Sequence, residues 1–447
     1  MVYDARVCLS VAATRCYHAV TMAVLYEFTR TPELARLSIE VELRGERLHP
    51  RFIGPWGLWR SRLVRVYFAW LNGLKPLRID GREGIWSLYF PPIPSAAHGS
   101  VIEAYLNTFL VKRRAPAAVT IGVTDACQYA CVHCSALRRN GDGARPGAAA
   151  AAPLTLDELK RVVDQSVAAG CGNVTFTGGE PLLYPHLEEL VAHVPRDHAV
   201  AQVFTNGREL TEERAAALAA AGLHSVQVSV DSPIPEEHDR LRGEAGAFAA
   251  ARRAVAAARR AGLLVGVSTY ATSASIRRGD VCSLARLAAS WGACELTVFD
   301  AIPTGRLLDD PDLELTKADR RRLRLQAFTT NRAAKRRLRV VTQTWTNSGH
   351  GFARFIGCLA GNCQFHVTAT GEFQPCDFMP LTMGNVRDAS VGDLWRRTCD
   401  HPAFCRHSDA CRMQSAEFRR RYIERIPPDA SLPYPMAYLD GSRVAAG

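Results

Sequence analysis

The sequence lacks any apolar run long enough to cross a membrane. A transmembrane helix needs about 20 consecutive apolar residues, and polar or charged residues interrupt every hydrophobic stretch well before that length. In the apolar N-terminal segment the interruptions are Asp4, Arg6 and Arg15, and no small-residue cleavage site follows. We therefore expect a cytoplasmic protein that neither spans a membrane nor is secreted. Peripheral contact of this segment with a membrane surface stays open as an alternative.

The sequence also lacks a disulfide framework. Its 14 cysteines are not evenly spaced but concentrate in two stretches, 127–134 and 358–411. Clusters at metal-ligand spacing are typical of proteins in a reducing compartment. The remaining cysteines are isolated in apolar or helical surroundings, where a thiol usually acts as a small buried hydrophobe. They are Cys8, Cys16, Cys171, Cys282 and Cys294.

Aromatic residues do not accompany the basic residues, although the net charge is +11. Much of the excess lies in arginine runs between residues 320 and 339, on a predicted helix where such charges are usually solvated. Because no nucleic-acid-binding motif is present either, we expect no nucleic-acid partner. A negatively charged peptide or lipid head group would suit this charge.

From Ala117 onward, short β-branched runs alternate with long alanine-rich amphipathic runs. This alternation predicts strand–helix units around a parallel sheet. Six units are too few to close an eight-stranded barrel, so the predicted fold is α/β, a partial (β/α)6 TIM-type barrel with its active face at the C-terminal ends of the strands. The expected strands are 119–123, 174–177, 201–205, 225–230, 264–270 and 295–299, with helices near 155–169, 186–194, 211–221, 246–261, 278–291 and 316–328.

Three cysteines, Cys127, Cys131 and Cys134, directly follow the first predicted strand. Three thiolates this close together can bind three irons of a [4Fe–4S] cubane and leave the fourth iron open for an exchangeable ligand. The alternative is a closed structural zinc site that takes its fourth ligand from elsewhere, for instance His133.

The CxxxCxxC spacing resembles that of the radical S-adenosylmethionine superfamily. Membership would imply that the open iron binds the amino and carboxylate groups of S-adenosylmethionine, and that one-electron reduction yields a 5′-deoxyadenosyl radical. After the second strand, Gly178, Gly179, Glu180 and Pro181 stand where the family has its GGEP motif, which binds the methionine amino group. Glycines also let the backbone approach a ligand closely, and a carboxylate suits an ammonium.

The next two strands end in polar residues that would face the same mouth of the barrel. Thr205 and Asn206 end the third strand, and Ser229 and Asp231 end the fourth. Arg242 lies in a stretch similar to the HDxxRG motif of peptide-modifying members. There the resemblance implies that the serine, the aspartate and the arginine support the cofactor.

The resemblance covers roughly residues 119–306 and implies three further cofactor contacts. Ser268 lies near the end of the fifth strand, and Ile302 follows the sixth in a loop that resembles the family's loop beside the adenine. His133 stands where the family often has a larger aromatic residue, and a histidine can also stack on adenine.

The second cysteine stretch resembles the SPASM or twitch extension, which binds an auxiliary [4Fe–4S] cluster. The resemblance makes Cys358, Cys363 and Cys376 ligands of that cluster. The fourth ligand would come from Cys399, Cys405 or Cys411, of which we favour Cys411. Because no CxxC pair follows Cys376, we expect one auxiliary cluster rather than two.

These patterns divide the chain into three regions. Residues 1–112 form an N-terminal accessory region of unknown role, residues 113–335 the radical S-adenosylmethionine barrel, and residues 336–447 a small irregular auxiliary-cluster domain. The combination of motifs resembles enzymes that abstract hydrogen from a peptide or protein, with an electron donor such as flavodoxin or ferredoxin.

Two alternatives remain for the function. One is radical modification of a small metabolite or lipid, because an amphiphile would suit the N-terminal tryptophans Trp56, Trp59, Trp70 and Trp86. The other is a non-catalytic iron–sulfur electron-transfer or scaffold protein, which would not need the GGEP and HDxxRG motifs. The sequence assigns no residue that quenches the substrate radical.

Overall fold

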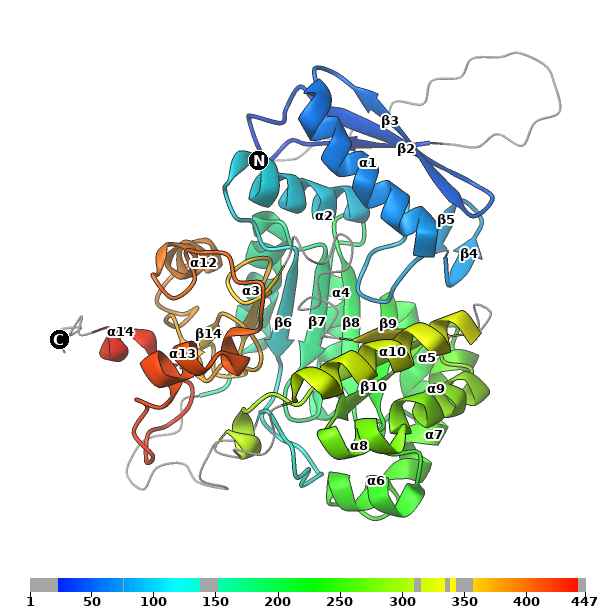
Figure 1. The fold of residues 1–447 in the computed structure, drawn as a ribbon, viewed down its shortest axis with the longest axis vertical. Helices are drawn as coiled ribbons and strands as arrows, with labels where there is room; N and C mark the ends of the chain where they lie inside the picture. The colour runs from blue at the N-terminus through cyan, green and yellow to red at the C-terminus, as the bar shows by residue number, and fades with distance from the viewer. Residues whose placement is uncertain are drawn as a thin grey trace.

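The computed structural model describes residues 23–74, 76–136, 152–308, 315–333, 338–342 and 357–440. These residues form an N-terminal module, a central α/β barrel and a C-terminal segment beside the barrel (Figure 1). Within these ranges, no helix has both the length and the apolar character needed to span a membrane.

The central sheet has nine strands in the order β12-β11-β10-β9-β8-β7-β6-β13-β14. Neighbouring strands are parallel except β13 and β14, which are antiparallel. Within the described residues the two edge strands do not pair with each other, so the barrel is open, as the sequence predicts. The strands are β6 (Ala118–Gly122), β7 (Asn173–Thr177), β8 (Val200–Thr205), β9 (Leu223–Ser229), β10 (Leu264–Ala271), β11 (Glu295–Asp300), β12 (Arg339–Thr342), β13 (Gln364–Val367) and β14 (Phe373–Gln374).

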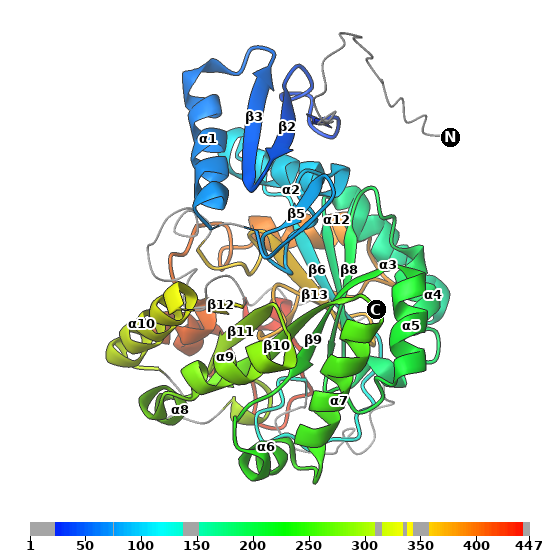
Figure 2. The same cartoon turned by 90° about the vertical axis from the view of Figure 1, so that its right-hand side faces the viewer.

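Amphipathic helices cover the outer face of this sheet (Figure 2). Each predicted helix is present, and α3 begins with a capping box in which Thr155 and Glu158 exchange hydrogen bonds of 2.8 and 3.2 Å. The predicted helices are α3 (Leu156–Ala169), α4 (Leu187–His193), α5 (Glu212–Ala221), α7 (Ala247–Arg260), α9 (Asp280–Trp291) and α10 (Lys317–Ala333). Two short helices at strand C-termini were not predicted, α6 (Pro235–Arg242) and α8 (Ser273–Arg278).

The six predicted strands correspond to β6–β11, and the sequence missed β12, β13 and β14. These three strands have only two to four residues each, too few for a local pattern to appear. Phe365 of β13 is paired with Val119 of β6 and stacks on Phe373 of β14, with ring centroids 4.7 Å apart. The sheet therefore continues across the predicted boundary at 335/336, and the domain limits stay a prediction.

The N-terminal module has its own aromatic core. His98 is buried there, with its two ring nitrogens 2.9 and 2.8 Å from the hydroxyls of Tyr26 and Tyr67. Trp56 and Trp86 are only 4% and 1% exposed, so their burial removes them from any lipid-facing surface. The elements are β1 (Val24–Glu27), β2 (Ser38–Arg44), β3 (Arg47–Ile53), α1 (Gly57–Leu74), β4 (Arg78–Asp80), β5 (Glu83–Ile85) and α2 (Ala96–Leu106). The side chain of Trp59 lies outside the described residues.

The C-terminal segment packs against the start of the barrel. Arg114, which precedes β6, donates hydrogen bonds to the carbonyls of Gly361 (2.9 Å), Cys399 (3.2 Å), Phe404 (2.6 Å) and Cys405 (2.7 Å). This one guanidinium joins the barrel to three parts of the cysteine-rich segment. The elements there are β15 (Leu381–Thr382), α12 (Val391–Asp400), α13 (Ala416–Phe418), β16 (Tyr434–Pro435) and α14 (Met436–Leu439).

Candidate functional site

The loop that contains Cys127, Cys131 and Cys134 follows β6 and is held from one side by the GGEP turn after β7. The amide of Gly179 donates to the carbonyl of Thr124 (2.7 Å), and the amide of Glu180 donates to that of Ala126 (2.8 Å). A Cβ on Gly179 would lie 2.2 Å from the Ala126 carbonyl oxygen, and one on Gly178 would lie 2.2 Å from that of Thr124. These glycines therefore let the backbone approach the cysteine loop. Their contact with a cofactor stays a prediction.

Two more glycines hold the same loop from other strand ends. Gly243, after α6, lies against Ala130, whose carbonyl oxygen would be 2.7 Å from an added Cβ. Gly305, after β11, lies against Cys134, whose carbonyl oxygen would be 2.1 Å from an added Cβ. Arg306 donates to the carbonyls of Ala130 and Cys131, both at 3.1 Å. Three separate strand ends therefore fix the cysteine loop, and the sequence did not show this role of Gly243, Gly305 and Arg306.

Glu180 is held between the ends of β7 and β8. Glu180 is 1% exposed. Its carboxylate accepts hydrogen bonds from the Thr205 hydroxyl (2.6 Å) and from the backbone amides of Asn206 (2.8 Å) and Leu182 (3.1 Å). Burial raises the pKa of Glu180 to about 7, although these hydrogen bonds oppose the shift. A cationic ligand would restore its charge, so the carboxylate is suited to bind an ammonium.

Asp231 and Arg242 form a buried ion pair beside the cysteine loop. The Asp231 Oδ2 lies 2.6 Å from Nε of Arg242 and 3.3 Å from Nε2 of His133. Burial alone would raise the pKa of Asp231, but the Arg242 guanidinium and His133 outweigh it and lower the pKa. Arg242 also reaches Cys131, with Nη1 3.8 Å from Sγ. The arginine thus places positive charge at a cluster thiol.

The His133 ring stacks on Tyr270, with centroids 4.4 Å apart and an interplanar angle of 17°. Tyr270, near the end of β10, was not predicted as a site residue. The hydroxyls of Ser229 and Ser268 lie 3.4 Å apart on neighbouring strands. Ile302 is buried in the loop after β11.

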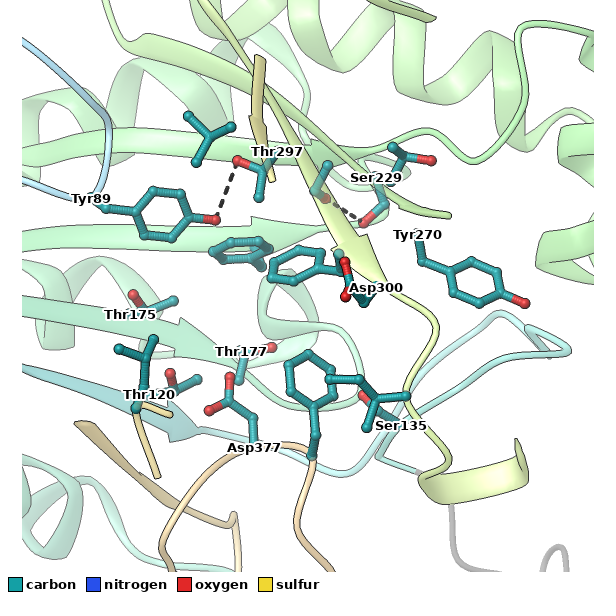
Figure 3. Close-up of a pocket in the computed structure, with 18 of the residues that line it drawn as sticks. Tyr89, Thr120, Ser135, Thr175, Thr177, Ser229, Tyr270, Thr297, Asp300 and Asp377 are labelled. Atoms are coloured by element: carbon teal, nitrogen blue, oxygen red, sulfur yellow. Dashed lines mark hydrogen bonds between the residues drawn. The ribbon is translucent and has the colours of Figure 1, made fainter. Parts of the chain in front are cut away.

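One cavity of about 1930 Å³ brings these residues together. The three cysteines and every predicted cofactor-binding residue except Pro181 line it. Pro181 is buried and begins the short turn Pro181–Leu183. Figure 3 shows Tyr270 and Ser135 at one end of this space, Tyr89 and Thr297 at the other, and Asp300 between them. Three further residues that line the cavity were not predicted from the sequence: Asp300, His366 and Asp377. The only sequence signal for Asp377 was its position directly after Cys376.

The second group of thiols lies beside the C-terminal core. Cys358, Cys376 and Cys411 pack against the same hydrophobic cluster, and Cys411 forms a side-chain hydrogen bond with Cys358 that lowers the pKa of Cys358. Cys363 is buried at the start of β13, while Cys405 is exposed. This arrangement favours Cys411 over Cys399 and Cys405 as a fourth ligand, which stays a prediction.

The donor sets fit iron–sulfur clusters. The described cysteines are free thiols, and burial raises the pKa of Cys127, Cys131 and Cys363, so bound iron is needed to stabilise their thiolates. Among the residues that the structure describes, no three His, Cys, Asp or Glu side chains converge as they would around a single metal ion. His133 faces Asp231 and Tyr270, which counts against the zinc alternative.

Comparisons with known proteins agree with this geometry. Residues 121–272 match the family model of the Radical SAM superfamily, and residues 358–414 match that of the SPASM iron-sulfur cluster-binding domain. The AdoMet-dependent heme synthase of Methanosarcina barkeri is 28% identical over 298 residues, which cover 63% of this chain and 82% of that protein. The mycofactocin maturase MftC of Mycolicibacterium smegmatis is 29% identical over 319 residues, which cover 67% of this chain and 77% of that protein.

Among solved structures, Streptococcus suis SuiB bound to S-adenosylmethionine has a TM-score of 0.50 at 16% identity, over 63% of this chain and 65% of SuiB. At that identity the likeness concerns the fold alone. Together with the cysteine loop and its supporting motifs, the family matches identify an enzyme that uses S-adenosylmethionine and iron–sulfur clusters. The chain therefore contains a radical SAM domain, matched over residues 121–272, and a SPASM domain on its C-terminal side, matched over residues 358–414.

Proposed function

We propose that this enzyme abstracts a hydrogen atom from a peptide or protein substrate held in the cavity. The size of the cavity, about 1930 Å³, is the observation that carries the proposal. The cavity also has to hold the cluster and S-adenosylmethionine, because their predicted ligands line it. Small-molecule pockets usually measure about 300–1,000 Å³, so the space beside the cofactor suits several residues of a peptide. Two relatives have names that concern maturation, MftC and, at 24% identity over 284 residues, the sporulation killing factor maturation protein SkfB of Bacillus subtilis.

The wall that α10 contributes also suits a peptide. Leu325 and Phe328 line the cavity and are 61% and 63% exposed. Arg321, Arg324 and Arg332 line it from the same helix. A peptide segment with apolar and acidic side chains would complement this face.

Reductive cleavage of S-adenosylmethionine to a 5′-deoxyadenosyl radical is the chemistry that the [4Fe–4S] cluster supplies when bound at Cys127, Cys131 and Cys134. The protein's own residues then have positioning roles. The Glu180 carboxylate binds the methionine ammonium, with Thr205 and Asn206 holding its two oxygens.

Beside the cysteine loop, the ion pair of Asp231 and Arg242 holds His133 and the Cys131 thiol in place. We assign His133, Ser229, Ser268 and Ile302 to the adenosine part of the cofactor.

In the SPASM segment we propose that Cys358, Cys363, Cys376 and Cys411 bind one auxiliary [4Fe–4S] cluster. An electron donor such as flavodoxin or ferredoxin would supply the reducing equivalent. We also propose the division of the chain into an accessory region (1–112), a barrel (113–335) and an auxiliary-cluster domain (336–447).

One observation favours a second candidate, a small-molecule substrate. The AdoMet-dependent heme synthase of Methanosarcina barkeri matches over 82% of its own length, against 77% for MftC of Mycolicibacterium smegmatis. A tetrapyrrole with its carboxylate groups would also complement the arginines of α10.

Anaerobic reconstitution followed by product analysis tests the proposal. The enzyme is incubated with S-adenosylmethionine, a strong reductant and each short peptide encoded beside its gene, and 5′-deoxyadenosine and peptide mass are measured. We expect 5′-deoxyadenosine together with a mass change in one peptide. A mass change in a tetrapyrrole but in no peptide would replace the first candidate by the second. Absence of 5′-deoxyadenosine from a cluster-loaded enzyme would contradict both.

A further inference from the structure

The N-terminal module reaches into the barrel at the end opposite the cysteine loop. The amide of Leu88 donates to Glu295, the first residue of β11, at 3.4 Å. Asn173, the first residue of β7, donates to the carbonyl of Tyr89 at 3.2 Å, and Gln202 of β8 donates to that of Leu88 at 3.5 Å. The segment after β5 therefore closes the barrel where its strands begin. Figure 1 shows the module above this end of the sheet.

Tyr89 lines the cavity, as do Trp86, Ser87 and Phe90 of the same segment. Its hydroxyl donates to the Thr297 hydroxyl at 3.3 Å, and both residues line the cavity. Figure 3 places this pair at the inner end of the space, far from Tyr270 and Ser135. A ligand that enters from the cysteine-loop side and reaches the Thr297 side of the inner end would therefore meet the Tyr89 ring.

A row of half-buried aromatic rings begins at Tyr89. Its ring lies 6.4 Å from that of Phe204 in β8, which lies 6.1 Å from Phe299 in β11, which lies 5.9 Å from Phe378 after β14. All four rings line the cavity, so all three regions of the chain contribute to one wall. Half-exposed aromatic rings inside a protein are suited to bind apolar groups.

Two acidic side chains, Glu295 and Asp377, lie close enough to act on the Tyr89 hydroxyl. Burial raises the pKa of this phenol well above its ordinary value, so the ring stays neutral. The hydrogen bond between the Tyr89 hydroxyl and Thr297 also holds the ring in one position. A neutral, fixed aromatic ring makes a defined stop for an apolar side chain.

We propose that Tyr89 is a specificity-determining residue: it forms the floor of the substrate cavity and limits the length of the apolar side chain that the enzyme accepts. This inference rests on the proposed function, because it treats the cavity as the substrate site. It gives the N-terminal module a role in the reaction without any contact with the cofactor.

Binding of 4-alkylphenols of increasing length to the full-length, cluster-loaded enzyme tests the floor directly. Isothermal titration with S-adenosylmethionine present would follow the series from phenol to 4-hexylphenol. In the wild type, affinity should rise about fourfold for each methylene buried (~0.8 kcal/mol) and stop rising when the chain meets Tyr89. In Tyr89→Ala the rise should continue to longer chains, and in Tyr89→Trp it should stop at shorter ones.

Tyr67→Phe is the matched control, because it removes a buried tyrosine hydrogen bond of the same module, 2.8 Å long, at a residue that does not line the cavity. It should keep the length limit of the wild type. Thermal unfolding is measured for every variant, and Tyr89→Leu replaces Tyr89→Ala if the latter does not fold. An identical length limit in the wild type and in both folded Tyr89 variants would overturn the proposal.

Binding of the alkylphenols requires neither a peptide nor catalytic turnover. The proposed role of Tyr89 can therefore be rejected independently of the proposed function. A length limit that moves with Tyr89 supports the floor even if no peptide is modified. Modification of a peptide together with an unchanged limit would support the proposed function and reject the floor.

Discussion

The two ends of the barrel are built in different ways. At the mouth, the cysteine loop is held by glycines from three strand ends, and each contact is made by a residue within a few positions of a recognisable motif. At the floor, Asn173, Gln202 and Glu295 hold a segment from another module, over sequence separations of 84 to 207 residues. The comparison teaches that local motifs mark the chemistry, whereas long-range side-chain contacts shape the space where the substrate binds.

Removal of a thiol at the mouth should have the largest effect. Cys127→Ala leaves two thiolates for the cluster, so 5′-deoxyadenosine formation should be lost completely and the iron content should fall. Cys282→Ala is the control, because that thiol lies on α9, outside both cysteine groups. Equal activity of the two variants would show that the cysteine loop does not hold the catalytic cluster.

The second-largest loss of activity should come from adding a single methyl group at the mouth. Gly179→Ala places a Cβ 2.2 Å from the Ala126 carbonyl oxygen, so the cysteine loop must move. We expect 5′-deoxyadenosine formation to fall roughly a hundredfold, since displacements of about 1 Å at reacting groups have effects of that size.

Gly392→Ala on α12 is the matched control for this substitution, because its new Cβ would meet no atom closer than 3.8 Å. An active Gly179→Ala enzyme with normal iron content would show that the mouth does not depend on this close approach.

At the floor, Glu295 should make stability depend on pH. Burial raises its pKa from the ordinary 4.5 to about 7, although Ser87, Arg339 and Leu88 oppose the shift. A carboxyl group with a raised pKa in the folded state stabilises the protein most below pH 4.5, and this contribution is lost as the pH rises through about 7.

Denaturant unfolding of the wild type and Glu295→Gln at pH 5 and pH 8 measures this contribution. The wild type should lose up to about 3 kcal/mol relative to the variant over this range. A constant difference between the two proteins would mean that Glu295 does not titrate in the folded state between these values.

Loss of one floor contact should have the smallest effect. Asn173→Ala removes the hydrogen bond to the Tyr89 carbonyl and the one that Asn173 accepts from the Thr175 hydroxyl, and it should lower the free energy of unfolding by about 2 kcal/mol. Thermal unfolding measures this change in stability. The variant Asn206→Ala, at the mouth of the barrel, is measured for comparison. A much larger loss for Asn173→Ala would show that this contact between the N-terminal module and the barrel contributes more than its hydrogen bonds.

Much of the mouth was predictable, because each of its elements has a local signal. Strand–helix alternation located β6–β11, and the cysteine spacing with the GGEP and HDxxRG stretches indicated which strand ends would matter. The pairing of His133 with Tyr270 was not predictable, because it depends on the geometry of two strand ends 137 residues apart in the chain. The floor gave no signal at all, since Leu88 and Tyr89 lie in a region without a motif and acquire their role only by contact with distant strands.

The pairing of β13 with β6 limits how such enzymes can be recombined. Phe365 and Val367 of β13 and Phe373 of β14 belong to the same hydrophobic core as Val119 and Ile121 of β6. A chimera that takes its auxiliary domain from a relative by joining the chains at residue 335 would therefore exchange part of the barrel's interior as well. A graft that begins after Gln374 would leave the host's sheet intact, but it would divide the four proposed auxiliary ligands between donor and host.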